Sequence, residues 1–508
     1  MKYRNPIISG MHPDPSICRV GDDYYLVNSS FEYFPGIPVF HSKNLIEWEL
    51  IGHCITRNSQ LTLRTGFPNG TGIFAPTIRY YNGIFYVVCT NVAFGGADDG
   101  NFLVWTKDPY SEWSDPIWLD CQGIDPSLFM DEDEAVYYTG TASGEIYLYK
   151  IDLQSGKRIG ECKNIWAGSG GNDPEGPHIY KIDGWYYLFI SEGGTEYCHM
   201  ITVARSRAVY GPYESCPRNP VLTNRSYGLP IKAVGHADLF CDQNDNWWTV
   251  CLGIRPISYP FRHNLGRETM LVPVEWDEDG WPVFGKNGLL EEEIEIDRLF
   301  LEEKAYPQKL LHNRYFDDFK GMNLEKEWNF IYNPLDGIFE LNGEGLILHG
   351  NNVSLFEAEP LAWIGRRQEH HKFHARTSLS FAPKEEGEEA GLCIYMNNRH
   401  HYEISMILLD GCRQLTIRRQ IGSLWKIENQ IPYIKNEVKL FLIADKEYYT
   451  FGYEEGERCI TLGRGETDYL TTEVGGRFTG NYIGLYATGN GKACSEKAVF
   501  NWFEYIGE

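Results

Sequence analysis

The chain has 508 residues, more than one domain usually needs, so two domains are expected. Its formal net charge of −24 argues against nucleic acid and anionic membrane surfaces as partners. No apolar run is long enough to span a membrane, and the N-terminal MKYRNPIISG has no signal-peptide core, so a cytoplasmic protein is expected. The 52 glycines, 25 prolines and 14% aromatic residues favour turns and strands, and helices should be few.

The cysteines support the same compartment. There are 13 of them, an odd number, scattered between Cys18 and Cys494, and none form a C-x-x-C pair. This pattern predicts free and mostly buried thiols, which are typical of a reducing cytoplasm.

Five segments before residue 300 share one pattern. Each starts with a small or acidic residue, often followed by proline, and continues through an apolar residue and a polar turn into an aromatic strand. The turns contain pairs such as Asn82-Gly83 and Asp183-Gly184, which favour hairpins. In chain order the segments begin at Asp14, Ala75, Asp125, Glu175 and His236.

These starts are spaced by roughly 50 to 60 residues, the length of a four-stranded propeller blade. Residues 1–300 are therefore predicted to form a five-bladed β-propeller, with a β-sandwich of accidental internal similarity as the competing interpretation. In a propeller, the inner strand of every blade starts at the central channel. The carboxylates that head three of the repeats, Asp14, Asp125 and Glu175, should therefore meet in one pocket.

The repeat stops near residue 300. Residues 301–315 have the composition of a linker, and residues 316–508 contain short alternating strands separated by turns. This pattern predicts a β-sandwich whose closing strand covers residues 498–505. The sandwich resembles a lectin-like module, a concanavalin-like jelly roll. The whole chain is thus expected to be all-β.

Three carboxylates on one axis suit the hydrolysis of glycosidic bonds, which needs an acid and a base or nucleophile on opposite faces of the sugar. Glu175 has the longer side chain and is predicted to be the acid, with Asp14 as the base that activates water. Asp125 would orient the acid and keep it protonated by like-charge repulsion. A single Asp-Pro-Ser is more often only turn chemistry, so the prediction depends on the matching positions of the three residues.

Four other residues are candidates for contacts with substrate. His236 could bind water or a calcium ion on the axis, or simply be hydrogen-bonded in a packed channel. Arg267 could bind sugar hydroxyls or pair with a catalytic carboxylate, and a surface salt bridge with Glu268 is the alternative. Phe31 and Phe74 could stack on a pentose, although single aromatic residues more often belong to a core.

Several motifs in the chain resemble the family 43 glycoside hydrolases, and the match covers essentially the whole sequence. It is strongest for the two-domain β-xylosidases and α-L-arabinofuranosidases, in which a sandwich follows the propeller. The motifs are Asn5-Pro6-Ile7, His12-Pro13-Asp14-Pro15-Ser16, Gly123-Ile124-Asp125-Pro126-Ser127, Pro174-Glu175-Gly176-Pro177, Gly235-His236-Ala237-Asp238 and Leu265-Gly266-Arg267-Glu268-Thr269.

The resemblance implies inverting hydrolysis, with Asp14 as general base, Asp125 as modulator of the acid and Glu175 as general acid. It implies that His236 lies on the axis, in some relatives beside calcium, and that Arg267 and Phe31 line the subsite of the terminal sugar. A sandwich loop that carries Phe478 is expected to close the pocket, so that only a chain end enters. No cofactor is expected to be required, with Ca²⁺ as the only candidate ion, and a homo-oligomer, a dimer or tetramer, is expected.

Two departures from the resemblance concern specificity. Phe74 stands where many xylosidases of this kind have Trp, and no aromatic residue lies near Ala142-Ser143-Gly144, where they often have one. A more open leaving-group side predicts β-D-xylosidase activity together with α-L-arabinofuranosidase activity on xylo- and arabino-oligosaccharides. The alternatives are a dedicated α-L-arabinofuranosidase, a retaining five-bladed fructan hydrolase and a non-catalytic glycan-binding protein.

Overall fold

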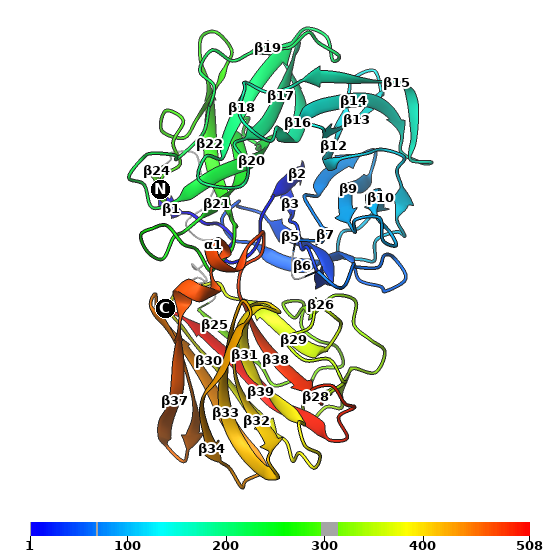
Figure 1. Cartoon of the computed structure of the whole chain (residues 1–508). Coiled ribbons are helices and arrows are strands. Elements are labelled where there is room, and N and C mark those ends of the chain that lie inside the picture. Colours follow the sequence, from blue (N-terminus) through cyan, green and yellow to red (C-terminus); the bar gives the residue numbers. More distant parts are fainter. Residues whose placement is uncertain (1, 68–69, 296–312) are drawn as a thin grey trace.

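The computed structural model describes residues 2–67, 70–295 and 313–508 of the chain. Its two bodies, a propeller and a sandwich, lie one above the other in Figure 1. Among the described residues the only helices are a 3₁₀ helix, η1 (Thr467–Leu470), and the short α1 (Thr472–Gly475). The predicted all-β class is therefore confirmed.

Five antiparallel sheets surround one axis and form the predicted five-bladed propeller (Figure 1). The inner strand of blade 2 is interrupted at Phe74, so that it is divided into β7 and β8. From the inner to the outer edge the strands are β2 (Ser16–Val20), β3 (Asp23–Val27), β5 (Gly36–Ser42) and β6 (Glu49–Ile55) in blade 1; β7 (Gly72–Ile73) and β8 (Thr77–Tyr81), β9 (Ile84–Val92), β10 (Gly100–Thr106) and β11 (Ile117–Trp118) in blade 2; β12 (Ile124–Met130), β13 (Val136–Ala142), β14 (Glu145–Asp152) and β15 (Lys157–Trp166) in blade 3; β16 (Glu175–Ile182), β17 (Trp185–Glu192), β18 (Met200–Ser206) and β19 (Glu214–Ser215) in blade 4; and β20 (Lys232–Cys241), β21 (Trp247–Ile254), β22 (Glu268–Trp276) and β23 (Pro282–Phe284) in blade 5.

Local sequence explains the hairpins and the packing of the blades. Asn82 and Gly83 have φ values of 50° and 81°, the left-handed backbone that a tight two-residue hairpin requires. Successive side chains of a strand point to opposite faces, so Tyr138 packs between blades 2 and 3 while Tyr137 packs between blades 3 and 4. Alternating aromatic and aliphatic residues therefore fill the spaces on both sides of a blade.

The N-terminal segment closes the propeller. Strand β1 (Lys2–Arg4) pairs with β24 (Glu293–Glu295), the last strand described before residue 313. Residues 301–312 of the predicted linker lie outside the described residues, and Arg314 and Tyr315, also assigned to that linker, begin strand β25.

The C-terminal body is the predicted sandwich of two antiparallel sheets. The closing strand expected at residues 498–505 is β39, an inner strand of the larger sheet. In spatial order the larger sheet contains β27 (Phe339–Leu341), β28 (Leu346–His349), β39 (Lys497–Gly507), β30 (Phe373–Ser380), β35 (Glu437–Ala444), β36 (Tyr448–Glu455) and β37 (Arg458–Glu466), with β25 (Arg314–Asp317) also paired to β39. The smaller sheet contains β29 (Ala362–Arg367), β38 (Tyr482–Thr488), β31 (Glu389–Asn397), β32 (His400–Leu409), β33 (Cys412–Ile421) and β34 (Leu424–Pro432).

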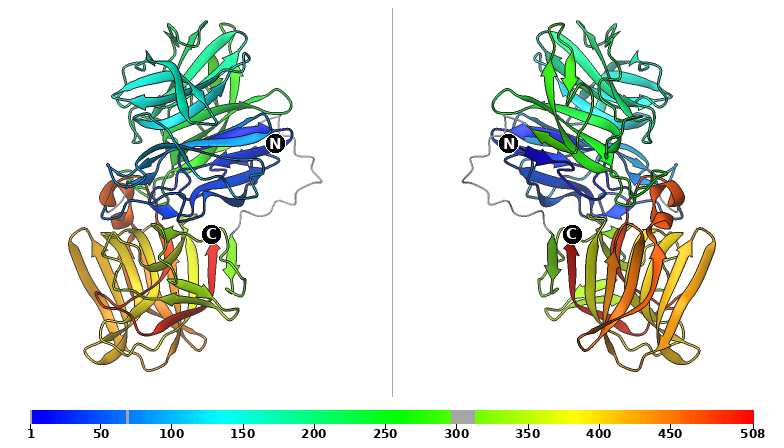
Figure 2. Two further views of the ribbon diagram at one scale, coloured as in Figure 1. Left: turned by 90° about the vertical axis from the view of Figure 1, so that its right-hand side faces the viewer. Right: turned by 90° about the vertical axis from the view of Figure 1, so that its left-hand side faces the viewer.

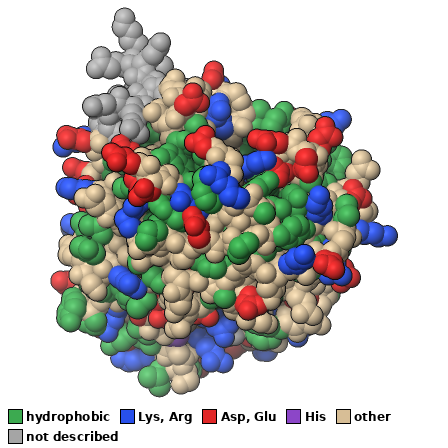
Figure 3. All heavy atoms as spheres, turned by 90° about the horizontal axis from the view of Figure 1, so that it is seen from above, with side chains coloured by type: hydrophobic (Ala, Val, Ile, Leu, Met, Phe, Trp, Pro, Cys, Tyr) green, Lys and Arg blue, Asp and Glu red, His purple; other side chains and the backbone are tan. Residues whose placement is uncertain are grey.

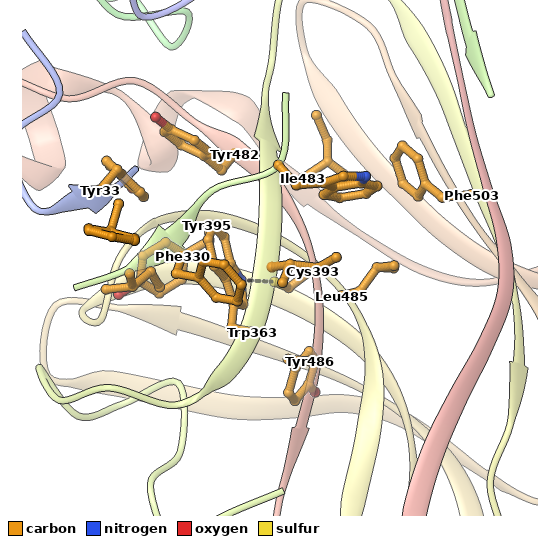
Figure 4. Close-up of a cluster of buried hydrophobic side chains, with 14 of the residues drawn as sticks. Tyr33, Phe330, Trp363, Cys393, Tyr395, Tyr482, Ile483, Leu485, Tyr486 and Phe503 are labelled. Carbon is orange, nitrogen blue, oxygen red and sulfur yellow. Dashed lines mark hydrogen bonds between the residues drawn. The ribbon is translucent and has the colours of Figure 1, made fainter. Parts of the chain in front are cut away.

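The two bodies share one continuous apolar core at their junction. Strand β4 (Tyr33–Phe34) of the propeller pairs with β26 (Phe330–Ile331) of the sandwich. Tyr33 stacks on Tyr482 at 3.9 Å between ring centroids, next to the buried Trp363, as Figure 4 shows. In both views of Figure 2 the helical segment near α1 lies between the two bodies. The shared core and the strand pairing therefore fix the sandwich against the propeller, so that a sandwich loop can contact the propeller face.

Among the described residues no helix is both long and apolar enough to cross a membrane. On the face of the propeller shown in Figure 3, acidic and basic side chains are interspersed.

Candidate active site

Three of the five residues that head the blades, and the glycine after a fourth, share an uncommon backbone conformation. Asp14, Asp125 and His236 have φ values of 53°, 55° and 52°, and Gly176, next to Glu175, has 59°. Asp and His tolerate this left-handed region better than most residues. In blades 3, 4 and 5 the pairing between the inner strand and its neighbour shifts register at the head residue. A β-bulge of this kind re-aims a side chain relative to the sheet. The heads thereby gather at the axis.

Asp14 lies in a buried and positively charged corner of the site. Its Oδ1 is 2.7 Å from Nη1 of Arg267, and its Oδ2 accepts a hydrogen bond of 2.5 Å from the hydroxyl of Ser29. Burial alone would raise the pKa of Asp14, but the charges of Arg267 and His236 and the Ser29 hydrogen bond outweigh it and lower that pKa below its usual value. Asp14 is therefore ionised at neutral pH.

Asp125 has the opposite electrostatic environment. It is buried, and the nearby charges of Glu175 and Asp14 add to the effect of burial, so its pKa is raised well above the usual value. The N–H of Gly176 donates to its Oδ2 at 3.1 Å, which ties Asp125 to the residue after Glu175. The site thus favours a bound proton at Asp125, beside Glu175.

Glu175 is the first residue of β16, and its side chain remains 21% exposed. Nε2 of His199, a residue that the sequence did not single out, lies 3.3 Å from its Oε1. A Cβ at position 235 would lie only 2.1 Å from the His199 ring, so the glycine before His236 makes room for it. In the sequence, Gly235 was the only indication that a bulky side chain such as His199 packs against this position.

A second residue missed by the sequence analysis shapes the loop that leads to Glu175. The buried carboxylate of Glu192 accepts hydrogen bonds from the N–H groups of Ser169 and Gly171 and from the hydroxyl of Thr202. A Cβ at Gly168 would lie 2.6 Å from this carboxylate, so the glycine-rich loop is wrapped closely around it. Glu192 therefore fixes the approach of the chain to the head of blade 4.

Arg267 joins the carboxylates to an aromatic wall. Its guanidinium carbon lies 5.6 Å from the ring centroids of both Phe31 and Phe478, and Nη1 also donates to the hydroxyl of Thr195 at 3.2 Å. The predicted alternative, a salt bridge between Arg267 and Glu268, is absent, because Glu268 pairs with Arg255 at 2.7 Å.

Three phenylalanines form this wall, two from the propeller and one from the sandwich. Phe478 is stacked parallel to Phe31 at 5.6 Å between centroids, and Phe74 packs edge-on against both at 5.3 and 5.7 Å. The backbones of Gly480 and Gly266 touch, since a Cβ at Gly266 would lie 3.1 Å from Gly480. The sandwich loop is thereby held against the catalytic face of the propeller.

His236 is buried at the axis, with Nδ1 at 3.9 Å from Oδ1 of Asp14 and its ring against Gly176. Burial lowers the pKa of His236 from its usual value. Calcium takes six to eight oxygen ligands, whereas no group of three or more His, Cys, Asp or Glu side chains in the described ranges is arranged to hold an ion. The donors around His236 therefore do not fit an all-protein calcium site.

A five-bladed propeller with a carboxylate cluster on its axis, beside an aromatic wall completed by a second domain, is typical of one class of glycoside hydrolases. The family described as Glycosyl hydrolases family 43 matches residues 3–282, and the beta xylosidase C-terminal Concanavalin A-like domain matches residues 316–506. The chain belongs to family 43 of the glycosyl hydrolases.

Named relatives are similar over almost the whole chain. A non-reducing end alpha-L-arabinofuranosidase from Bacteroides ovatus is 40% identical over 99% of this chain and 94% of its own. A xylosidase/arabinosidase from Butyrivibrio fibrisolvens is 38% identical over 98% of both. Among solved structures, the GH43B protein of the Bacteroides ovatus xyloglucan PUL has a TM-score of 0.94 at 39% identity, with both chains covered completely.

Proposed function

We propose that this glycoside hydrolase acts at chain ends and releases terminal β-D-xylose and α-L-arabinofuranose with inversion of the anomeric carbon. The observation that carries the proposal is the unequal electrostatics of the pocket. Asp14 is kept ionised beside Arg267, while the site favours a proton at Asp125, beside Glu175. An ionised carboxylate and a protonated one thus coexist on the propeller axis at the same pH, the two states that a base and the partner of an acid require.

In this mechanism Glu175 is the general acid. Its carboxyl group donates a proton to the glycosidic oxygen as the bond from that oxygen to the anomeric carbon breaks. Asp14 accepts a proton from a water molecule, whose oxygen attacks the anomeric carbon from the opposite face. Asp125 orients Glu175 through the backbone of Gly176, and after the products leave Asp14 releases its proton to solvent while Glu175 takes one up.

The aromatic wall supports exo action on a small neutral sugar. Phe74 and Phe478 are partly exposed and offer apolar surface, with the buried Phe31 packed against both, and Arg267 offers its N–H groups to hydroxyls beside Asp14. Pockets of this composition, mainly apolar with a few fixed polar groups, are typical of sites that orient one small ligand. Because the wall is completed by a second domain, the interior of a long chain would not pass through it.

The direct test of these roles compares Glu175→Gln and Asp14→Asn with wild type on nitrophenyl β-D-xyloside. Each variant should lose about 10²- to 10⁴-fold in kcat while a pentose still binds. Glu134→Gln, in an exposed hairpin turn of blade 3, is the matched control and should keep full activity. Wild-type turnover in either catalytic variant would remove the role assigned to that residue.

The stereochemistry can be tested by ¹H NMR of the sugar that is released first from a xylobiose-like substrate. Inversion predicts α-xylose from a β-xyloside, before mutarotation mixes the anomers. Initial release of β-xylose would instead establish a retaining mechanism, as in the fructan hydrolases considered above.

A dedicated α-L-arabinofuranosidase is the second candidate. It is favoured by the 40% identity to a relative that bears this name. The ratio of kcat/KM on nitrophenyl α-L-arabinofuranoside to that on nitrophenyl β-D-xyloside separates the two candidates. A ratio above about 10³ would favour the dedicated enzyme, since a difference of this size needs more than a single methylene or hydroxyl contact.

We also propose that the enzyme works in the cytoplasm as a homo-oligomer, on oligosaccharides already taken up. All 13 cysteines lie within the described ranges and are unpaired, which agrees with a reducing compartment. Light scattering of the purified protein would give the oligomeric state.

A further inference from the structure

A second layer of polar side chains lies beneath the blade heads, and the mechanism above does not use it. Ser16 and Ser127 follow Asp14 and Asp125 by two residues, and Asp238 follows His236 by two. His178 follows Glu175 by three, and Arg79 comes from β8 of blade 2. The five inner strands β2, β8, β12, β16 and β20 thus contribute one residue each, and we name Ser16, Arg79, Ser127, His178 and Asp238 the hub.

The centre of the hub is an ion pair between blades 2 and 5. Arg79 binds both carboxylate oxygens of Asp238, at 2.7 Å to Oδ2 and 3.0 Å to Oδ1. The hydroxyl of Ser16 donates to Oδ2 at 2.6 Å, and the phenol of Tyr180 in blade 4 donates to Oδ1 at 2.6 Å. Asp238 is fully buried, and this bidentate geometry is the strongest that an arginine and a carboxylate can adopt.

His178 extends the network to blade 3. Its Nδ1 lies 3.0 Å from Nη2 of Arg79 and 2.9 Å from the hydroxyl of Ser127. A guanidinium can only donate, so Nδ1 is the acceptor and the proton of the neutral ring is on Nε2. Burial lowers the pKa of His178 to about 3, which agrees with a neutral imidazole. The ion pair of Arg79 and Asp238 is then internally neutral.

A buried ion pair of this kind contributes little net stability, because well-packed apolar side chains would serve as well. Its effect is instead geometric, since directional bonds fix the distances between strands that have no backbone pairing with one another. In the propeller the inner strands belong to separate sheets, and their heads carry the carboxylates. Among the described residues, the hydrogen bonds of the hub join all five inner strands to one another.

We propose that the hub is a positioning device, which fixes the spacing of Asp14, Asp125 and Glu175 by linking the strands directly below them. The inference rests on the proposed function, because it assigns the hub to the same three carboxylates. A displacement of about 1 Å between reacting groups can cost 10²-fold in rate. Ser127 and Asp125 share one strand, so a shift at Ser127 is transmitted to Asp125 over two residues.

Ser127→Ala tests the proposal, with Thr139→Val as the matched control. Both hydroxyls are buried in blade 3 on neighbouring strands, but that of Thr139 donates to the carbonyl of Tyr147 at 2.7 Å, outside the hub. Each variant loses one hydrogen bond and should lower Tm by a similar amount. Only Ser127→Ala should lower kcat, by about 10-fold, with KM changed less than about twofold.

Coupling between blades gives a second measurement. Ser16→Ala, on a different blade, should also lower kcat by about 10-fold, and the double variant should lose less than the product of the two single losses. Ser127→Thr, which keeps the hydroxyl, should restore most of kcat. If Ser127→Ala does not fold, Tyr180→Phe removes the hydrogen bond from Tyr180 to Asp238 of the hub, together with the one that Tyr180 accepts from the N–H of Leu239, and should likewise lower kcat.

The results separate the two levels of inference. If Ser127→Ala and Ser16→Ala keep wild-type kcat and lose only Tm, as Thr139→Val does, the hub is merely structural and the inference is wrong. That result would leave the proposed function intact as long as Glu175→Gln is inactive. Full activity of Glu175→Gln would instead overturn the proposed function itself.

Discussion

Arg267 of the propeller and Phe478 of the sandwich meet at the candidate active site, with the guanidinium carbon 5.6 Å from the ring centroid. The same guanidinium binds Asp14, so a side chain of the second domain packs on the group that keeps the candidate base ionised. This relationship makes the sandwich part of the pocket. It also makes the activity sensitive to the junction between the two domains.

The first prediction concerns Phe478→Ala, which opens the pocket and uncovers one side of Arg267. We expect kcat/KM to fall by about 10- to 100-fold, because an apolar face for the sugar and the exclusion of water are both lost. Phe356→Ala is the control, a partly buried phenylalanine of the sandwich whose ring packs on His401. Equal kinetics of the two variants would remove Phe478 from the site.

The second prediction concerns the pH dependence of Arg267→Gln. The charge of Arg267 lowers the pKa of Asp14, so its loss should raise that pKa. A base works only when it is deprotonated, and the acidic limb of kcat/KM should therefore move to higher pH, by about one unit or more. Arg207→Gln, an exposed cation on blade 4, should leave the limb in place. An unmoved limb in Arg267→Gln would mean that Asp14 is not the group that titrates there.

The third prediction concerns the anchor of the loop that carries Phe478. Glu473 of α1 accepts hydrogen bonds from the backbone N–H and from Nδ1 of His263, at 2.9 and 2.7 Å. Glu473→Gln weakens this contact and should raise KM several-fold with a smaller effect on kcat, since the wall for the sugar is loosened. Val474→Ala, the exposed neighbour on α1, should have wild-type kinetics. A wild-type KM in Glu473→Gln would show that the loop does not depend on this anchor.

The fourth prediction concerns Glu32, which is 4% exposed and follows Phe31 at the junction of the domains. Burial raises the pKa of its carboxyl from 4.5 to about 8. The folded state therefore holds this proton more tightly than the unfolded state. The resulting stability is fully present below about pH 4.5 and is lost as the pH rises to about 8. Glu32→Gln cannot ionise, so its Tm should fall less than that of wild type between about pH 5 and pH 8. Parallel Tm curves would contradict this account.

Much of the fold could be predicted because it is repeated along the chain. Each blade has its own head, turn and aromatic strand, so five independent copies of one pattern support the same architecture. The hairpin at Asn82-Gly83 shows why such local signals are reliable, since both residues have the positive φ that the turn needs. The meeting of Asp14, Asp125 and Glu175 followed from the symmetry of the repeats, without knowledge of any contact between them.

The sequence by itself therefore determined the blades, the sandwich and the set of residues that face the axis. Only the tertiary structure decided the partners of those residues: His199 beside Glu175, the Arg79–Asp238 pair beneath the heads, and the pairing of Arg267 with Asp14 rather than with its neighbour Glu268. The physical reason is that a repeat specifies the direction of each side chain through local backbone geometry. Contacts between blades depend instead on distances across the axis and on burial. The same is true of the pKa values: burial and neighbouring carboxylates raise that of Asp125, whereas the charge of Arg267 helps to lower that of Asp14.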